Sequence, residues 1–432
     1  MGEMQELSTF WFVTIGAVKV IAVFTVVMAV VAYMTLAERR VSAFIQDRLG
    51  PNRVGPFGLL QPIADGLKNI IKEETMPGTA AKFYFVLGPA LAIMPAVVTI
   101  AVIPFAAPLP TPVGTVDMVV ADVPIGILYI LALSSLAVYG IVLSGWASNN
   151  KYAFLGGLRA SAQMISYEVA LGLSVIAVLL LVGNVTLTET VWQQQQLGMW
   201  FVFPLSLAFI FFLISALAET NRLPFDMPEA ESELITGYHT EYSAMKFSMF
   251  FIAEYAHVVT ASALLATLFF GGWDIPFWTG DDMFRHESGW IRGFDEAGAP
   301  IPATPSVLIT LLTLGAFCAK TGFFLLLYIW IRWTLPRFRY DQVMHLGWKV
   351  MLPGALGYIM LVAGTMLVLD QLEVPFGLVY GGVLTAVSGV TTLAFLFFVD
   401  RDRVIAGAHR KRNVARRRVR VAAETGGPSA SN

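Results

Sequence analysis

Charged residues are scarce in this chain, because lysine, arginine, aspartate and glutamate make up only 13% of its 432 residues. A soluble protein would carry about a quarter. Hydrophobic residues reach 56%, and the mean hydropathy is +0.69. This composition excludes an ordinary water-soluble protein and predicts an all-α polytopic membrane protein.

Residues that bind metals and cofactors are scarce as well. Cys318 is the one cysteine, which excludes an internal disulfide and a cysteine-ligated iron–sulfur or zinc centre. Of five histidines only His257 lies well inside an apolar segment, whereas haem in a helical bundle needs a facing pair. The glycine-rich stretch at 50–58 contains two prolines and lacks the spacing of a phosphate-binding loop. We therefore expect no metal or cofactor on this chain. If the protein takes part in redox chemistry, the electrons must come from another subunit.

Long hydrophobic runs are what the chain has in abundance. A bilayer core takes about 20 apolar residues per helix. The acidic leader before the first run differs from a cleavable signal peptide, so we expect this helix to be retained. The sequence predicts about nine spans, near 11–37, 83–104, 123–146, 163–182, 200–218, 245–270, 306–331, 350–369 and 377–399.

The distribution of positive charge predicts the orientation. Of the 28 lysine and arginine residues, 24 lie in one alternating set of connections, while the opposite set holds only Arg285 and Arg292. Because positive residues concentrate on the cytoplasmic side, we expect the N-terminus outside and the C-terminus in the cytoplasm. The positive set comprises 38–82, 147–162, 219–246, 332–349 and the tail after 400.

The segment 57–73 is too polar and too short to span a membrane. Its apolar residues recur at helical spacing, with polar side chains between them, and this pattern is typical of a helix in the cytoplasmic membrane interface. The apolar positions are Leu59, Leu60, Ile63, Leu67, Ile70 and Ile71.

The connection 219–243 concentrates negative charge between two apolar runs, with Arg222 as its one basic residue. Pro224 and Pro228 stiffen it, so its charges are held in place. A loop that only aids solubility is the alternative, but fixed charge beside aromatic residues favours a functional loop. The six acidic residues are Glu219, Asp226, Glu229, Glu231, Glu233 and Glu241.

Four ionisable residues stand out within or at the ends of predicted spans: Glu168, Glu219, Glu254 and Lys320. An ionised side chain at that depth costs at least a few kcal/mol, so each is expected to face protein or water. Lys19 is a weaker case, because it lies near the outer end of its span, where a lysine can reach the membrane surface. A structural ion pair between Lys320 and Glu254 is one interpretation. Three glutamates on successive helices beside an acidic loop favour the other, a buried polar path for protons.

Three long motifs resemble one family. They are LAERRVSAFIQDRLGPNRVGPFGLLQPIADGLKNIIKEE at 36–74, ETNRLPFDMPEAESELITGYHTEYS at 219–243 and IRWTLPRFRYDQVMHLGWK at 331–349. The family is the H subunit of proton-pumping NADH–quinone oxidoreductase, which is subunit 1 in mitochondrial complex I. The resemblance extends from about residue 10 to 369.

This resemblance implies roles for individual residues. A quinone passage would be lined or supported by Glu38, Arg39, Arg40, Arg48 and Asp65. A coupling loop that senses quinone reduction would include Glu219, Arg222, Asp226, Glu229, Glu231, Glu233 and Glu241. A proton path would involve Glu168, Glu219, Glu254, Tyr255 and Lys320.

The resemblance also implies the surroundings of the chain. Quinone would be the substrate, while NADH, FMN and the iron–sulfur clusters would be bound by partner subunits. The partners would be quinone-binding peripheral-arm subunits, small membrane subunits and lipid of the bacterial plasma (inner) membrane, with no nucleic acid.

The family likeness covers a domain at 1–370 with eight spans. A ninth helix at 371–400 and a basic, disordered cytoplasmic tail at 401–432 are expected beyond it. One alternative is the membrane anchor of a related proton-pumping hydrogenase or of a dehydrogenase with another donor. A stand-alone ion transporter is another, but it would show inverted internal repeats, and the sequence shows no convincing repeat.

Overall fold

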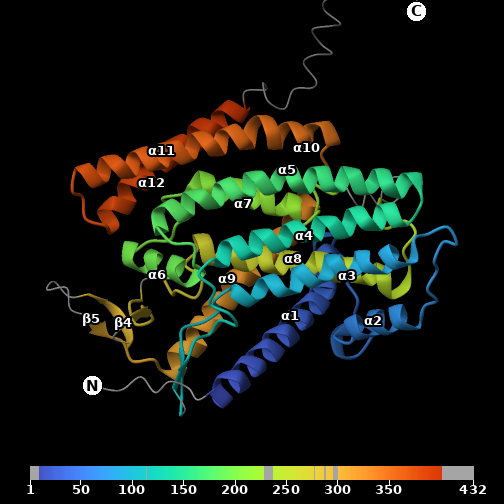
Figure 1. Cartoon of the computed structure of the whole chain (residues 1–432), viewed down its shortest axis with the longest axis horizontal. Helices are drawn as coiled ribbons and strands as arrows, with labels where there is room; N and C mark the ends of the chain where they lie inside the picture. Colours follow the sequence, from blue (N-terminus) through green and yellow to red (C-terminus); the bar gives the residue numbers. More distant parts are fainter. Residues whose placement is uncertain are drawn as a thin grey trace, which may run out of the picture.

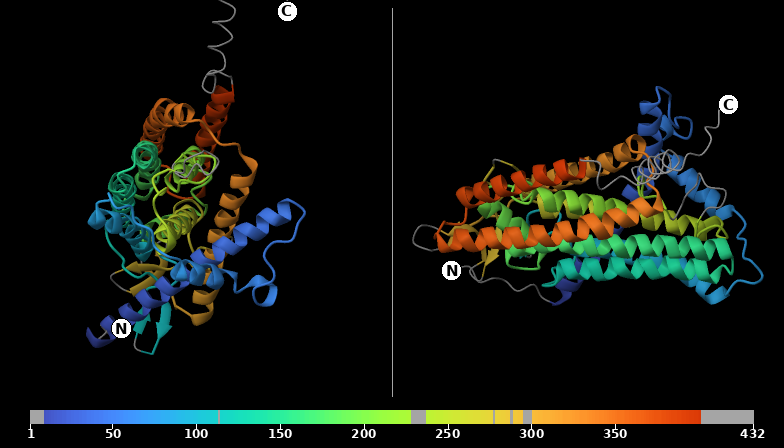
Figure 2. Two further views of the ribbon diagram at one scale, coloured as in Figure 1. Left: turned by 90° about the vertical axis from the view of Figure 1, so that its right-hand side faces the viewer. Right: turned by 90° about the horizontal axis from the view of Figure 1, so that it is seen from above.

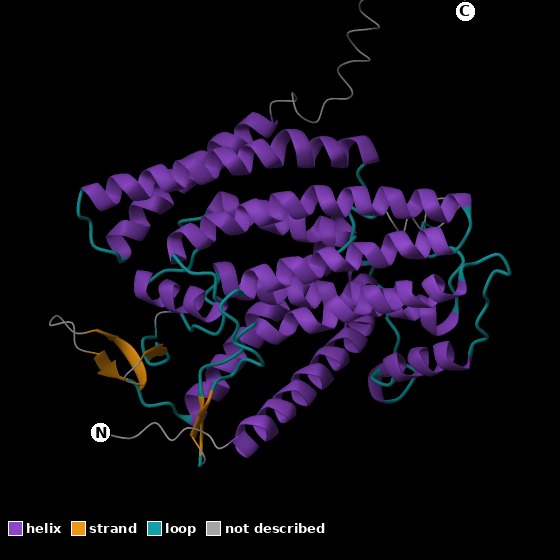
Figure 3. Ribbon diagram, in the orientation of Figure 1, coloured by secondary structure: helices purple, strands orange, loops and turns teal. Residues whose placement is uncertain are grey.

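The computed structural model describes residues 9–112, 114–227, 237–276, 278–286, 289–294 and 300–400. Helices account for nearly all of the regular structure in these ranges (Figure 3). They are α1 Thr9–Ile45, α2 Gln61–Ile71, α3 Lys82–Val98, α4 Gly126–Ala147, α5 Lys151–Val182, α6 Leu187–Leu197, α7 Ser206–Glu219, α8 Ala244–Phe269, α9 Val307–Thr334, α10 Tyr340–Leu346, α11 Leu352–Gln371 and α12 Leu378–Asp400.

Within the described residues, eight helical segments are long and apolar enough to cross a membrane, and α10 and α11 form one of them. Most run nearly parallel, whereas α1 crosses the bundle at a steep tilt (Figures 1 and 2). The predicted all-α polytopic membrane fold is therefore confirmed. The eight segments are Phe10–Ile45, Lys82–Val102, Gly126–Ala147, Lys151–Val182, Ala244–Phe269, Val307–Thr334, Tyr340–Gln371 and Leu378–Phe397.

The span predicted at 200–218 differs from the others. Residues 201–205 form turns, and α7 has only 14 residues, or about 21 Å at 1.5 Å per residue, against a hydrocarbon core of about 30 Å. The non-helical backbone is satisfied by the buried Gln194, whose Oε1 accepts hydrogen bonds from the N–H groups of Phe201 (3.1 Å) and Gly271 (2.9 Å). Hydropathy does not reveal these hydrogen bonds, so the sequence predicted a longer helix than the structure contains.

Helix α8 lies at the centre of the bundle, where it packs against α1, α3, α7 and α9. Close packing of α3 on α4 depends on small residues, because a Cβ atom at Gly140 would approach the Ala92 nitrogen to 2.8 Å. Helices α5 and α8 have the largest buried share among the long segments, whereas α1 has the smallest, at 11%. The exposed apolar surface of α1 is suited to lipid or a partner subunit.

The two ends of the bundle carry different structures (Figure 1). At one end α2 forms within the segment predicted to be amphipathic, and its six apolar residues are exposed. The opposite end, here called the sheet end, carries two small antiparallel sheets, one in the connection from α3 to α4 and one in the connection from α8 to α9. Their strands are β1 Leu109–Thr111, β2 Gly114–Val116, β3 Phe284–His286, β4 Gly289–Phe294 and β5 Pro300–Pro302.

Helix α12 packs against α7 and α11 through a group of hydroxyl side chains that we call the serine seam: Ser206, Tyr358, Ser388 and Thr392. Ser388 Oγ accepts a hydrogen bond from the backbone N–H of Ser206 (3.1 Å) and lies 2.7 Å from Tyr358 Oη. The extension thus supplies a partner to the first N–H group of the short helix α7. Such groups are costly to leave unpaired in lipid.

Candidate functional site

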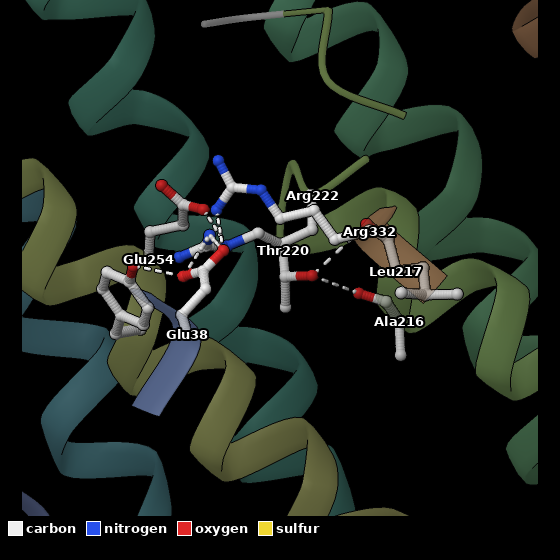
Figure 4. Close-up of polar contacts among 8 residues, drawn as sticks. Glu38, Ala216, Leu217, Thr220, Arg222, Glu254 and Arg332 are labelled. Carbon is white, nitrogen blue, oxygen red and sulfur yellow. Dashed lines mark hydrogen bonds and ion pairs between the residues drawn. The ribbon is translucent and has the colours of Figure 1, made fainter. Parts of the chain in front are cut away.

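A buried network of ion pairs connects three helices and one loop. Glu38 lies on α1, Glu254 and Tyr255 on α8, Arg332 in the last turn of α9, and Arg222 in the connection after α7. Figure 4 shows both carboxylates and the Arg332 side chain converging beside Arg222. Residues far apart in the sequence therefore form one polar centre, here called the Glu38 network.

Glu38 is the hub of this network. Tyr255 Oη donates a 2.5 Å hydrogen bond to Glu38 Oε2, and Arg222 Nη1 lies 3.3 Å from the same oxygen. Arg332 forms an ion pair with Glu38 Oε1. Arg222 forms a second ion pair with Glu254 and places its guanidinium 4.2 Å from the centre of the Tyr255 ring.

The Glu38 network is balanced in charge, because two carboxylates face two guanidinium groups. Glu38, Arg222 and Glu254 are only 7%, 8% and 9% exposed. Removing one partner of a buried pair typically costs about 3–5 kcal/mol, because the remaining charge is left uncompensated. A change of charge at one residue of the network therefore strongly alters the electrostatic energy of the other charged residues.

A cavity of about 510 Å³ opens beside Glu38, between α1, α2, the start of α8 and the end of α9. This volume is in the usual range for small-molecule sites. Apolar side chains make up much of its wall, among them Met28, Val31, Phe247, Phe251, Ile252 and Trp333. Its polar groups include Glu38, Arg39, Asp65, Tyr255 and Arg332. The cavity is thus suited to a molecule with an apolar body and a polar head.

The predicted passage residues lie in different places. Arg39 and Asp65 join α1 to α2 through a 2.7 Å ion pair and line the cavity. Arg40 is half-buried on α1, and Arg48 is exposed and bonds to Gln46 (2.7 Å). Neither Arg40 nor Arg48 lines this cavity, so its wall includes only three of the five residues.

The connection 219–243 is anchored at both of its described ends. Asp226 forms an ion pair with Arg337, and Asn150 Nδ2 donates a 2.7 Å hydrogen bond to Glu241 Oε1. Gln163 on α5 donates to the carbonyl oxygen of Phe225 (2.7 Å). Glu229, Glu231 and Glu233 lie outside the described residues.

Beyond the Glu38 network, polar residues continue towards α5. Two cavities of about 30 Å³ each are lined by Glu219, and Glu254 lines one of them. Glu219 bonds to the Ser134 hydroxyl and is close enough to Glu168 for their charges to interact. Ser135 donates a short hydrogen bond to Glu168. Three of the predicted path residues, Glu254, Glu219 and Glu168, therefore follow one another in space.

Lys320 is separate from this series. Its ammonium group donates to the carbonyl oxygens of Phe270 (2.6 Å), Gly272 (3.1 Å) and Asp274, near the sheet end. The ion pair with Glu254 considered from the sequence does not form, because Glu254 is paired with Arg222. The sequence could not show that Glu254 and Lys320 lie at different depths of the bundle.

Asp281, close to Lys320, gives a pH prediction. Burial, reinforced by Asp274 and Asp282, raises the pKa of Asp281 to about 7. The unfolded chain ionises this group near pH 4, so its contribution to stability is complete below about pH 4 and lost as the pH rises through 7. Asp281→Asn should therefore slow amide exchange of Ile275 and its neighbours more at pH 8 than at pH 5. An equal effect at both values would contradict this assignment.

The sequence missed four residues that the structure brings to the site. Arg332 is within a motif that carried the family resemblance, and a base at the end of an apolar helix was the available signal. Gly66 lines the large cavity, and Tyr328 borders a smaller one with Glu38. His257 lines both cavities next to Glu219. No sequence pattern indicated that Gly66, Tyr328 and His257 each face a cavity.

Comparison with known proteins gives matches over most of the chain. The family model described as NADH dehydrogenase matches residues 18–363. The H subunit of NADH-quinone oxidoreductase from Leptospira biflexa is 47% identical over 353 residues, which cover 79% of this chain and 92% of that protein. NADH-ubiquinone oxidoreductase chain 1 of Chondrus crispus is 49% identical over 350 residues, 81% of this chain and 96% of that protein. NADH-quinone oxidoreductase subunit 8 of Rhodothermus marinus is 47% identical over 364 residues, which cover 83% of this chain and 98% of that protein.

Proposed function

We propose, because the chain belongs to the NADH dehydrogenase family, that it forms the quinone passage of an NADH–quinone oxidoreductase and couples quinone reduction to proton translocation. As a member of this family the chain is a multi-pass membrane subunit of that enzyme. The alternatives of a hydrogenase anchor or a stand-alone transporter are not favoured by the names of its relatives.

One observation carries the proposal: the cavity of about 510 Å³ meets the Glu38 network at its polar side. A quinone has an apolar tail and a polar headgroup, and both match this wall. The exposed apolar residues of α2 give a long tail a surface from which to enter. Tyr255 and Arg332 line the cavity and bond directly to Glu38.

Coupling follows from the balance of charge. Reduction of a quinone to a quinol adds two electrons and takes up two protons, so negative charge develops near Arg332 and Tyr255 before the protons arrive. In a low-dielectric site that charge competes with Glu38 for the same guanidinium groups. A weakened hold on Glu38 changes how Arg222 is shared between Glu38 and Glu254. The change then reaches Glu219 and Glu168 as a shift in their affinity for protons.

The proposed function implies an orientation in the membrane and a set of partner subunits. The N-terminus faces the outside of a bacterial plasma membrane and the C-terminus the cytoplasm, on the basis of the positive charge in alternate connections. The α2 end then faces the cytoplasm, where quinone-binding peripheral-arm subunits meet the 219–243 connection. NADH, FMN and iron–sulfur clusters belong to these partners, and small membrane subunits and lipid cover the exposed helices.

Photolabelling tests the proposal. In the assembled complex, a long-tail quinone with a photoreactive group should label peptides from α1, α2 and the first turns of α8. Excess unmodified quinone should suppress the labelling. Labelling confined to other subunits, or labelling of these peptides that excess quinone leaves unchanged, would contradict a passage at this cavity.

The extension beyond residue 370 has a different proposed role, in assembly. Truncation after Asp370 removes the α12 part of the serine seam and leaves the Ser206 N–H group and the Tyr358 hydroxyl without their Ser388 partner. The Tyr358 hydroxyl keeps a longer hydrogen bond to the Pro204 carbonyl oxygen (3.4 Å), and an unpaired N–H group costs about 1–3 kcal/mol. We expect a lower yield of complex, with the turnover of each assembled complex unchanged.

Truncation after Asp400 is the matched control, because it removes the basic tail and keeps α12. A yield restored by this longer chain would assign the effect to α12, and a yield that stays low would assign it to the tail. Normal yield with lost catalysis after the shorter truncation would show that the extension acts in the reaction instead.

A further inference from the structure

We propose that His257 holds the water that connects Glu254 to Glu219, so that this histidine is the bridging residue of the proton path. This inference rests on the proposed function, because it specifies how one step of the path is made. Among the described residues no hydrogen bond joins the two carboxyl groups, because Glu254 is paired with Arg222 and Glu219 bonds to Ser134. A connection between them therefore needs another group.

The position of His257 fits this role. It lies on α8, three residues after Glu254, so the two side chains share one face of the helix. One of the small cavities is lined by Glu254, His257 and Glu219 together. The other is lined by His257 and Glu219 and continues to Ser134, which bonds to the Glu219 carboxyl group. His257 and Glu219 are thus shared by two consecutive spaces.

Each cavity can hold water. A single water needs about 10–15 Å³ of space and two to four polar partners. The volume here is about 30 Å³ in each case, and carboxyl, hydroxyl and imidazole groups line the walls. Thr220 lines both cavities as well, but its hydroxyl already donates to Ala216 O of α7 (3.0 Å).

The imidazole also has an unmet need for a partner. His257 Nε2 is buried and has no hydrogen-bond partner within the described protein. Buried polar atoms are normally bonded, either to protein or to an ordered water. A neutral imidazole has one donor and one acceptor nitrogen. It can therefore accept from a water on one side and donate on the other, which a pair of ionised carboxylates cannot do.

Substitution of His257 in the assembled complex tests the inference. In His257→Phe an apolar ring replaces both nitrogens, and we expect NADH–quinone turnover in coupled proteoliposomes to fall about tenfold. His257→Asn keeps one donor and one acceptor and should restore most of that turnover. Recovery by an amide separates water binding from the filling of space.

One control substitution on α8 and a second apolar substitution of His257 accompany this test. Thr267→Val removes a buried hydroxyl from the same helix, whose hydrogen bond within the described residues goes to Ala263 O (2.9 Å), and should leave turnover unchanged. If the Phe complex does not assemble, His257→Leu removes the same two nitrogens with a smaller side chain. Wild-type turnover in the apolar variant that assembles, or equal loss in that variant and His257→Asn, would overturn the bridging role.

Glu254→Gln, measured in the same preparation, separates this inference from the proposed function. A slow Glu254→Gln complex beside a normal His257→Phe complex would refute the bridge and leave the path through the glutamates in place. Normal turnover in both variants would refute the path itself.

Discussion

Complex that carries Glu254→Gln should assemble and reduce quinone about tenfold more slowly in coupled vesicles, with proton translocation lowered in parallel. Glutamine keeps the size of the side chain and can still accept from Arg222. It removes one of the two negative charges that balance Arg222 and Arg332. The spare positive charge then draws Glu38 more tightly to Arg222, so the network responds less to charge on the quinone.

The matched control for this variant is Glu373→Gln, which neutralises an exposed carboxylate between α11 and α12. It should be silent in assembly and in turnover. The loss in Glu254→Gln should appear in the maximal rate and spare the KM for quinone, because Glu254 does not line the large cavity. A raised KM with normal maximal rate would mean that Glu254 acts in quinone binding and that the coupling role is wrong.

Gly66→Phe should obstruct the cavity and raise the KM for a long-tail quinone about tenfold, with a smaller effect on a short-tail analogue. Gly66 lies on α2 and contributes to the wall of the cavity. A Cβ atom built at this position meets no atom within 4 Å. The backbone therefore tolerates a side chain, and a large one occupies the space that the quinone needs.

Two variants of the same helix serve as controls. Gly66→Ala adds only the Cβ atom and should be close to the wild type. Ala64→Phe adds the same ring at a residue that does not line the cavity, and it should affect long-tail and short-tail quinones alike. If Ala64→Phe and Gly66→Phe gave the same pattern, the effect would come from disturbance of α2 at the interface.

Much of the fold could be predicted because its signals are local. Runs of apolar residues predict membrane helices wherever the helix is long, and the alternation of apolar and polar residues marked α2. The exception was α7, whose late start depends on Gln194 and on Ser388 in the extension. Both act across large distances in the sequence, and neither changes the local hydropathy.

Part of the candidate site could also be predicted, because some of its signals are local. Glu254, Glu219 and Glu168 stood out because a carboxylate in an apolar helix is costly unless it has partners, whereas Glu38 was indicated only by the family resemblance. The identity of those partners is set by packing, so the sequence offered Lys320 for Glu254 where the structure pairs it with Arg222.

Residues that act through position alone left no signal in the sequence. Gly66 matters because it faces a cavity, and His257 because it lies between two small ones. A histidine inside an apolar segment suggested only a test for haem, because histidine pairs are what haem requires.

The most direct test of coupling is the steady-state rate of NADH–quinone reduction by coupled vesicles that contain Glu219→Gln. Glu219 does not line the large cavity and lies beyond the Glu38 network, next to Ser134 and Glu168, so its removal can reach the quinone only along the proposed path. We expect a rate about tenfold below the wild type with an unchanged KM for quinone. A wild-type rate with a normal ratio of protons to electrons would contradict it.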